Sequence, residues 1–115
     1  MANDQIEAIE KEAEKSRVAI AFGDALIRLK NNKDFKDVVL KGYFEAEPIR
    51  LVHLKAEASM AAPDKQAAIL SQIDAIGNFS AYLNAALHKA AQAERTLEDT
   101  EAALIEINEE LAGAK

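Results

Sequence analysis

Apolar residues recur with a seven-residue period over much of the second half of the chain. With Leu83 in the first core position, the other core positions follow at alternating steps of three and four. They are Ala86, Ala90, Ala93, Leu97, Thr100, Leu104, Ile107 and Leu111, and the same register runs backwards through Phe79, Ile76, Gln72 and Ile69. Such a period, with charged residues at most other positions, is typical of a long helix that packs against another helix. We expect this helix to extend from about residue 64 to about residue 111.

The first thirty residues carry a second pattern with the same period. Its core positions are Ile6, Ile9, Ala13, Ile20 and Ile27, with the small residues Ser16 and Gly23 in the alternate positions. The pattern predicts a helix over residues 4–30, with acidic residues in its opening turns, the sign that a helix N-terminus favours. A further apolar stripe consists of Val18, Phe22, Ala25 and Leu29. The second half of this helix is therefore apolar on two sides, and we expect it to enter a thicker core.

Two shorter helices are predicted between these long ones. Residues 31–33 form a break, and Asp34 can cap the next helix. Pro48 lacks an amide donor and disfavours helical geometry in Glu47, so we expect a break there, with Pro48 in the first turn of a helix that runs to about residue 58. Residues 59–62 form a loop, and Pro63 begins the last helix. The apolar register passes through Gly77 and Asn78 without a shift, so we expect that helix to be continuous.

The lengths of these helices predict an all-α antiparallel hairpin. Residues 64–111 would span roughly 70 Å as a helix and residues 4–30 about 40 Å, so the first helix covers only part of the last. The expected stalk is coiled-coil-like and consists of helix 4–30 against the C-terminal half of helix 64–111, with a small helical tip from residues 34–58. The expected neighbours are Ile6 with Leu111, Ala13 with Leu104, Ile20 with Leu97, and Ile27 with Ala90. We expect residues 1–115 to form a single helical domain.

Charge is concentrated near the two ends of the chain. Residues 1–14 and 94–115 together hold twelve acidic and three basic residues, and the rest holds eight acidic and eleven basic, for a net charge of −6. In the hairpin both acidic segments meet at one end of the stalk. The excess of acid argues against direct binding to nucleic acid, which needs a basic face. It leaves open an acidic inhibitor or adaptor that captures a basic site on a host protein.

No pattern of residues predicts catalysis, a cofactor or a metal site. The chain has no cysteine, its four glycines make no nucleotide-binding loop, and His53 and His88 make no zinc motif. We therefore expect a protein that is not an enzyme. The start of the chain lacks the features of a secretory signal, and the apolar run over residues 18–23 is too short to cross a bilayer. We expect neither export nor membrane insertion.

The most distinctive local string is residues 42–50, which contains Gly42, Tyr43, Phe44 and Arg50. One interpretation is a tight helix corner, with glycine allowing close approach and the aromatic rings filling the core of the tip. The alternative is that Tyr43 or Phe44 forms, with Arg50, an exposed anchor for a protein partner, because these residue types are enriched in interface hot spots. The long apolar seam has two readings as well. It serves the hairpin within one chain, or its uncovered part serves self-association.

Several short strings within residues 34–83 resemble one group of proteins. They are Asp34-Phe35, Gly42-Tyr43-Phe44, Ile49-Arg50-Leu51-Val52 and Ile73-Asp74-Ala75-Ile76-Gly77. With these strings, residues 35–83 are similar to small proteins encoded among the head and portal genes of tailed bacteriophages. The resemblance implies a structural or virion-assembly protein that works in the host cytoplasm during assembly or in the virion. It implies head or portal components, or other copies of the chain, as partners, and no residue role is carried over.

Overall fold

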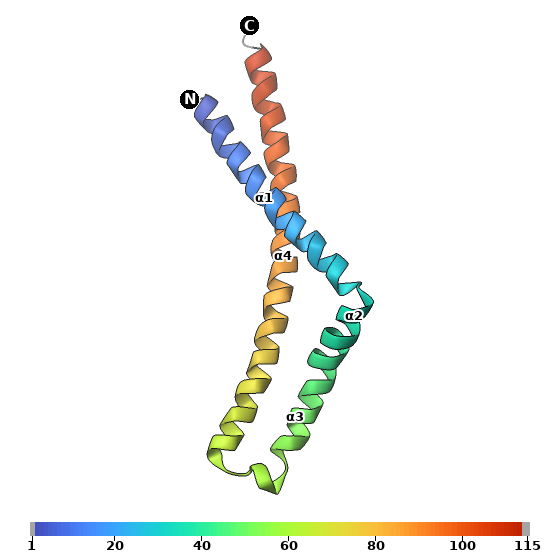
Figure 1. Ribbon diagram of the computed structural model, residues 1–115. Coiled ribbons are helices and arrows are strands. Elements are labelled where there is room, and N and C mark those ends of the chain that lie inside the picture. Colours follow the sequence, from blue (N-terminus) through green and yellow to red (C-terminus); the bar gives the residue numbers. More distant parts are fainter. Residues whose placement is uncertain (1, 114–115) are drawn as a thin grey trace. The chain divides into compact units, whose positions relative to one another are not determined.

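The computed structural model describes residues 2–113, which are all-α and contain no strand. The elements in chain order are α1 (Ala2–Lys30), α2 (Lys33–Phe35), the π-helix η1 (Lys36–Ala46), α3 (Glu47–Lys55), the 3₁₀-helix η2 (Ala58–Met60) and α4 (Pro63–Gly113) (Figure 1). The long helix α4 packs against α1, which confirms the predicted all-α hairpin. The predicted continuity of α4 through Gly77 and Asn78 is confirmed too.

The fold divides into two compact units, and both long helices contribute to each. Unit 1 consists of residues 1–25 and 86–115, and unit 2 consists of residues 26–85. Unit 1 therefore pairs most of α1 with the C-terminal part of α4, and unit 2 contains the shorter helices.

Small residues form the core of unit 1. Its two helices run antiparallel and cross, and they separate towards the start of α1 and the end of α4 (Figure 1). The most buried positions are Ala13, Ser16, Gly23, Ala90 and Ala93. The predicted core positions from Ile6 to Gly23 and from Ala86 to Ile107 are buried or half-buried, so this part of the heptad prediction is confirmed. Leu111 is exposed, against the prediction.

The axial register of unit 1 differs from the prediction by one turn of helix. A Cβ added to Gly23 would overlap the Cβ of Ala90, so these two residues face each other at close range. The predicted neighbour of Ala90 was Ile27, which is exposed instead. A seven-residue repeat specifies which face is buried but allows several axial offsets, and the smallest pair of residues sets the point of closest approach.

The second apolar stripe of α1 does not enter a core. Val18 is 62% exposed and Phe22 is 52% exposed, and Ala25 and Leu29 are exposed as well. The expectation of a thicker core there is wrong. In unit 2 the buried residue of α1 is Leu26, which belongs to neither predicted stripe. The prediction failed because an apolar stripe reports that a face is apolar, not that another element covers it.

Unit 2 has a core of large side chains. Leu51, Ile69 and Ile76 are buried, and the half-buried residues packed against them are Tyr43, Phe44, Leu54, Met60 and Ile73. In this part of α4 the stripe that faces the core is Ile69, Ile73, Ile76 and Ser80. The predicted register is wrong at Gln72 and Phe79, which are exposed. An α-helix has about 3.6 residues per turn, so a strict heptad drifts around it and the buried stripe moves by one position.

The caps and turns of unit 2 also differ in detail from the prediction. The side chain of Asn32, not that of Asp34, caps the next helix, and its Oδ1 accepts from the Phe35 amide at 3.0 Å. The predicted loop over residues 59–62 contains part of η2. The Gln66 side chain closes the turn, because its Nε2 donates to the Lys55 carbonyl at 3.0 Å and to the Met60 carbonyl at 2.8 Å.

Pro48 lies in the first turn of α3, as predicted, but no break precedes it. Ala46 and Glu47 both have right-handed helical geometry, and the Glu47 amide donates to the Gly42 carbonyl, five residues earlier. The expected break is therefore wrong. Pro48 stands where the bonding pattern changes from π to α, and a residue without an amide donor disturbs the helix least at such a change of pattern.

Candidate functional site

The residues predicted to bind a partner lie close together in unit 2, where η1 joins α3. Tyr43 and Phe44 belong to the last turns of η1, and Arg50 lies near the start of α3. Because η1 continues directly into α3, these residues share one uninterrupted helical segment. Tyr43 and Arg50 line one depression at the surface, whereas Phe44 packs against the core and is not among the residues that line it.

Tyr43 and Phe44 form an aromatic cluster with Phe79 of α4. The ring centroids of Tyr43 and Phe44 are 5.6 Å apart, those of Tyr43 and Phe79 6.1 Å, and those of Phe44 and Phe79 5.4 Å in an edge-to-face arrangement. These separations fall in the range in which aromatic pairs attract one another. Tyr43 and Phe44 are half-buried against the core of unit 2. The rings therefore help to build the unit, and their role in binding a partner stays a prediction.

Arg50 is exposed and forms an ion pair with Glu47, one turn earlier on the same helix. The Arg50 Nε donates to Glu47 Oε1 at 2.6 Å, and Nη2 contacts the same oxygen. The Arg50 side chain keeps 56% of its surface in solvent. An exposed pair of this kind contributes at most about 1 kcal/mol to stability. Its clearer effect is to hold the guanidinium group in one position at the surface.

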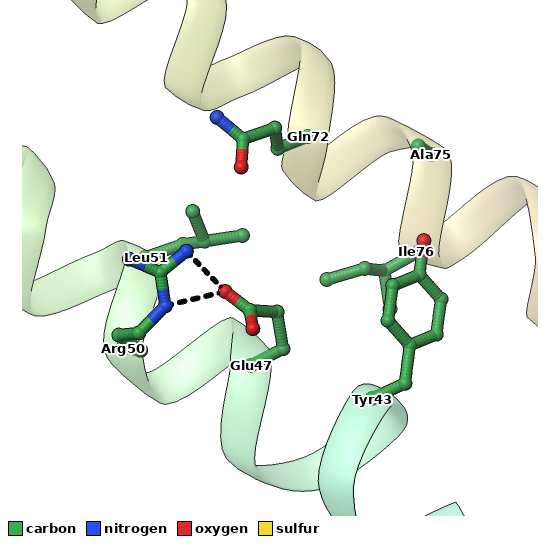
Figure 2. Close-up of a pocket in the computed structure, with 7 residues that line it drawn as sticks. All are labelled: Tyr43, Glu47, Arg50, Leu51, Gln72, Ala75 and Ile76. Carbon is green, nitrogen blue, oxygen red and sulfur yellow. Dashed lines mark hydrogen bonds and ion pairs between the residues drawn. The ribbon is translucent and has the colours of Figure 1, made fainter. Parts of the chain in front are cut away.

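Tyr43, Glu47 and Arg50 border a shallow depression between α3 and α4 (Figure 2). Its lining residues are Tyr43, Glu47, Arg50, Leu51, Gln72, Ala75 and Ile76. Leu51 and Ile76 belong to the core, so the depression has an apolar floor, and the Arg50–Glu47 pair and the Gln72 amide supply polar groups at its rim (Figure 2). Its volume is about 280 Å³. Small-molecule sites usually have about 300–1,000 Å³, so the depression lies just below the lower end of that range.

The sequence analysis did not single out five of the lining residues, and two of these five, Glu47 and Gln72, are polar. Glu47 could have been found, because opposite charges three residues apart on a helix are neighbours. Gln72 could not, since the predicted register placed it in the core and its true position depends on how α4 packs on α3. The exposed apolar residues Val38, Ile49 and Val52 were missed as well.

The described part of the chain holds no group of three or more histidine, cysteine or acidic residues placed to bind a metal ion. Within residues 2–113 no buried side-chain nitrogen or oxygen lacks a hydrogen-bond partner. None of the helices over the same residues is both long enough and apolar enough to span a membrane.

Comparison of the chain with protein-family models, with curated proteins and with solved structures found no match.

Proposed function

We propose that this chain is a non-enzymatic bacteriophage structural or virion-assembly protein that acts through helix-mediated protein–protein interaction in the host cytoplasm. The observation that carries the proposal is that large apolar side chains stand in solvent as neighbours on single helix faces. Ile49 and Val52 lie three residues apart on α3, and Val18 and Phe22 lie four residues apart on α1. Such pairs are the side chains with which a helix docks into a partner.

The depression of unit 2 adds to this argument. It offers an apolar floor and a positioned arginine, and residues of both kinds are common in interface hot spots. It also lies within residues 35–83, the segment that resembles small proteins of phage head and portal gene clusters. That resemblance supplies the phage setting of the proposal, and the exposed helix faces supply the mode of action.

The test asks whether the protein is recovered with phage particles and whether the exposed residues Ile49 and Val52 of α3 are needed for that recovery. Virions and head-assembly intermediates are purified from lysed host cells, cross-linked and analysed by mass spectrometry, with the wild-type chain and the I49E/V52E variant compared. We expect the wild-type chain to be cross-linked to head or portal components and the variant to be recovered several-fold less. The A67E/A68E variant, which adds the same charge at exposed alanines of α4, should behave as wild type. Absence of the chain from particles and from intermediates would contradict the proposal.

A second function, an acidic inhibitor or adaptor, is favoured by the placement of charge in unit 1. All twelve acidic residues of segments 1–14 and 94–115 are exposed. The start of α1 and the end of α4 lie at the same end of this unit, so both acidic segments belong to that end, although the helices separate there (Figure 1). Replacing Glu98, Glu101, Glu106 and Glu109 with glutamine should abolish capture of a basic host protein. Capture that is unchanged, and insensitive to salt, would remove this candidate.

A further inference from the structure

Unit 1 is tightly packed in its middle and looser at one end. In its middle, Ala13 and Ala93 have exposed fractions of only 1% and 8%. Towards the start of α1 and the end of α4 the two helices separate (Figure 1). We call this part of the unit, which consists of residues 3–12 of α1 and 101–113 of α4, the open end.

The large apolar residues of the open end turn inwards but are only partly covered. Ile6 and Ile9 of α1, and Leu104 and Ile107 of α4, continue the buried stripes of the unit and are half-buried. Leu111, one turn after Ile107, is 45% exposed. Burial therefore falls along both helices as they separate. Each helix keeps an inner face, formed by these residues, whose apolar surface the other helix does not fully cover.

Acidic side chains flank the inner faces. Successive residues of an α-helix are about 100° apart, so a residue next to an inward-facing one stands at its flank. Four exposed glutamates directly precede or follow such a residue or Ala13, and they are Glu10, Glu12, Glu106 and Glu110. None of the four belongs to an ion pair over residues 2–113.

The rest of the open end adds to the negative charge. It holds four more exposed acidic residues, which are Asp4, Glu7, Glu101 and Glu109. In residues 3–12 and 101–113 the only basic residue is Lys11. Lys11 lies two positions from both Ile9 and Ala13, so it points to the outer side of α1 and away from the inner faces. The open end thus combines uncovered apolar surface with charge of one sign.

We propose that the open end of unit 1 binds a basic amphipathic helix of a partner protein, which packs on the inner faces of α1 and α4 as a third helix. This inference rests on the proposed helix-mediated interaction and names the chemistry of the partner. Apolar residues of the partner, at helical steps of three and four, cover Ile9, Ile107 and Leu111. Lysines or arginines beside its apolar face lie opposite the flanking glutamates.

The charge of the open end disfavours other occupants. A second copy of this chain that docked through the same end would bring eight acidic residues of each copy together, and repulsion between like charges opposes that contact. Nucleic acid is disfavoured in the same way, because its phosphates are negative. Affinity for a basic helix should fall as salt is added, since part of the attraction is between exposed charges.

The test measures binding of a synthetic peptide to the full chain. The peptide has about 20 residues, long enough to form a helix, with leucines at helical steps on one side and lysines on the other. Fluorescence anisotropy gives its dissociation constant, and NMR of the isotope-labelled chain locates the site, which we expect at residues 3–12 and 101–113. A peptide of the same composition in scrambled order, and one with glutamate in place of lysine, should bind about tenfold or more weakly.

A matched pair of isoleucines tests whether the inner face is used. I107S removes an inward-facing apolar side chain and should weaken binding of the amphipathic peptide about tenfold. I105S makes the same change two positions away, at a residue that is 60% exposed on the outer side, and should bind as the wild-type chain does. Circular dichroism verifies that both variants remain helical.

A second pair of variants tests the flanking charge and leaves the apolar residues in place. E106Q/E110Q should weaken binding several-fold at low salt, because two of the flanking carboxylates are lost. E45Q/E57Q, which makes the same change in net charge at exposed positions of unit 2, should have no effect.

The inference is overturned if the scrambled peptide binds as tightly as the amphipathic one, if the site lies outside the open end, or if I107S and I105S bind the peptide equally well. Those results would leave the proposed function standing as long as I49E/V52E still reduces recovery with particles. Loss of that effect, with binding of the peptide at the open end intact, would count against the proposed function alone.

Discussion

Units 1 and 2 share two helices but close their cores with side chains of different size. In unit 1 the buried residues are alanine, serine and glycine, and the helices approach closely at Gly23 and Ala90. In unit 2 the buried residues are Leu51, Ile69 and Ile76, with aromatic rings packed against them. Hydrophobic stabilisation is roughly proportional to the apolar area buried. Unit 2 therefore depends on filling its core, and unit 1 depends on keeping its side chains small.

Charge separates the two units as clearly as side-chain size. Unit 1 holds thirteen acidic and six basic residues, whereas unit 2 holds seven acidic and eight basic residues. The unit with the small buried side chains therefore carries all of the excess acid, since basic residues outnumber acidic ones by one in unit 2. Its stability should therefore respond more strongly to added salt, which screens repulsion between exposed carboxylates.

The largest expected effect on the free energy of unfolding comes from removing a large side chain from unit 2. Leu51 has no exposed surface, so L51A should leave a cavity and lower the free energy of unfolding by about 2–5 kcal/mol. Denaturation with urea, followed by circular dichroism, measures the change. V52A, at the exposed neighbouring position, is the control and should change stability by about 0.5 kcal/mol or less. Similar losses of stability for both variants would contradict the burial of Leu51 in the core of unit 2.

The same variant tests whether the chain is a single domain, as predicted. If units 1 and 2 unfold together, calorimetry of L51A should show one transition shifted as a whole. Two separate transitions, with only one shifted, would show that the units unfold independently.

The next largest effect on stability is expected when one methyl group is added to the core of unit 1. The new Cβ of G23A would overlap Ala90, and overpacking costs about 1–3 kcal/mol, of which the better helix propensity of alanine recovers about 1 kcal/mol. The matched control is G77A on α4, where nothing lies within 4 Å and the propensity gain should appear alone as higher stability. Adding A90G to G23A makes room for the methyl group and should remove the overlap. Stabilisation by G23A alone would contradict the close approach.

A smaller effect distinguishes the observed cap from the predicted one. N32A removes the side chain that accepts from the Phe35 amide, and loss of an N-cap costs roughly 1 kcal/mol. D34A removes the residue that the sequence pattern had favoured, and it should have less effect. Thermal unfolding of both variants measures the difference, and an equal or larger loss for D34A would favour the predicted cap.

The smallest effect is expected at the rim of the depression. E47Q removes the charge that holds Arg50, and since the Arg50 side chain is 56% exposed the loss of stability should be at most about 1 kcal/mol and should vanish at high salt. K55A, at an exposed position on the same helix, serves as the control. A loss that persists at high salt would indicate that the pair is more than a surface contact.

Much of the fold is determined by local pattern, because helix propensity and apolar period act over a few turns. The helices, the continuity of α4 past Gly77 and the buried stripe from Ile6 to Gly23 all depend on such short-range rules. The axial register that places Gly23 against Ala90 does not depend on short-range rules. Sliding one helix along the other by one turn buries nearly the same face of each. The exposure of Phe22 depends on the absence of a covering element, which no residue of α1 encodes.

The candidate site was predictable to a similar extent. Tyr43, Phe44 and Arg50 stood out because aromatic residues, a glycine and an arginine lie within nine residues. Glu47 is predictable from helical spacing. Gln72 requires knowledge of which face α4 turns towards α3, and the heptad register gave the wrong face. Pro48 was expected to interrupt the helix. The π-helix η1 that precedes it corresponds to no pattern in the sequence that we can identify.

The hydrogen bonds of Gln66 bear on how this protein would meet a protease. One amide group holds both the end of α3, at Lys55, and the end of η2, at Met60. Proteases cleave extended segments that can leave the body of a protein and enter the enzyme's cleft, and connecting turns are their usual targets. Because Gln66 lies on α4, residues 56–62 can extend into such a cleft only after both bonds break. The turn should therefore resist nicking better than its exposed, alanine-rich sequence suggests.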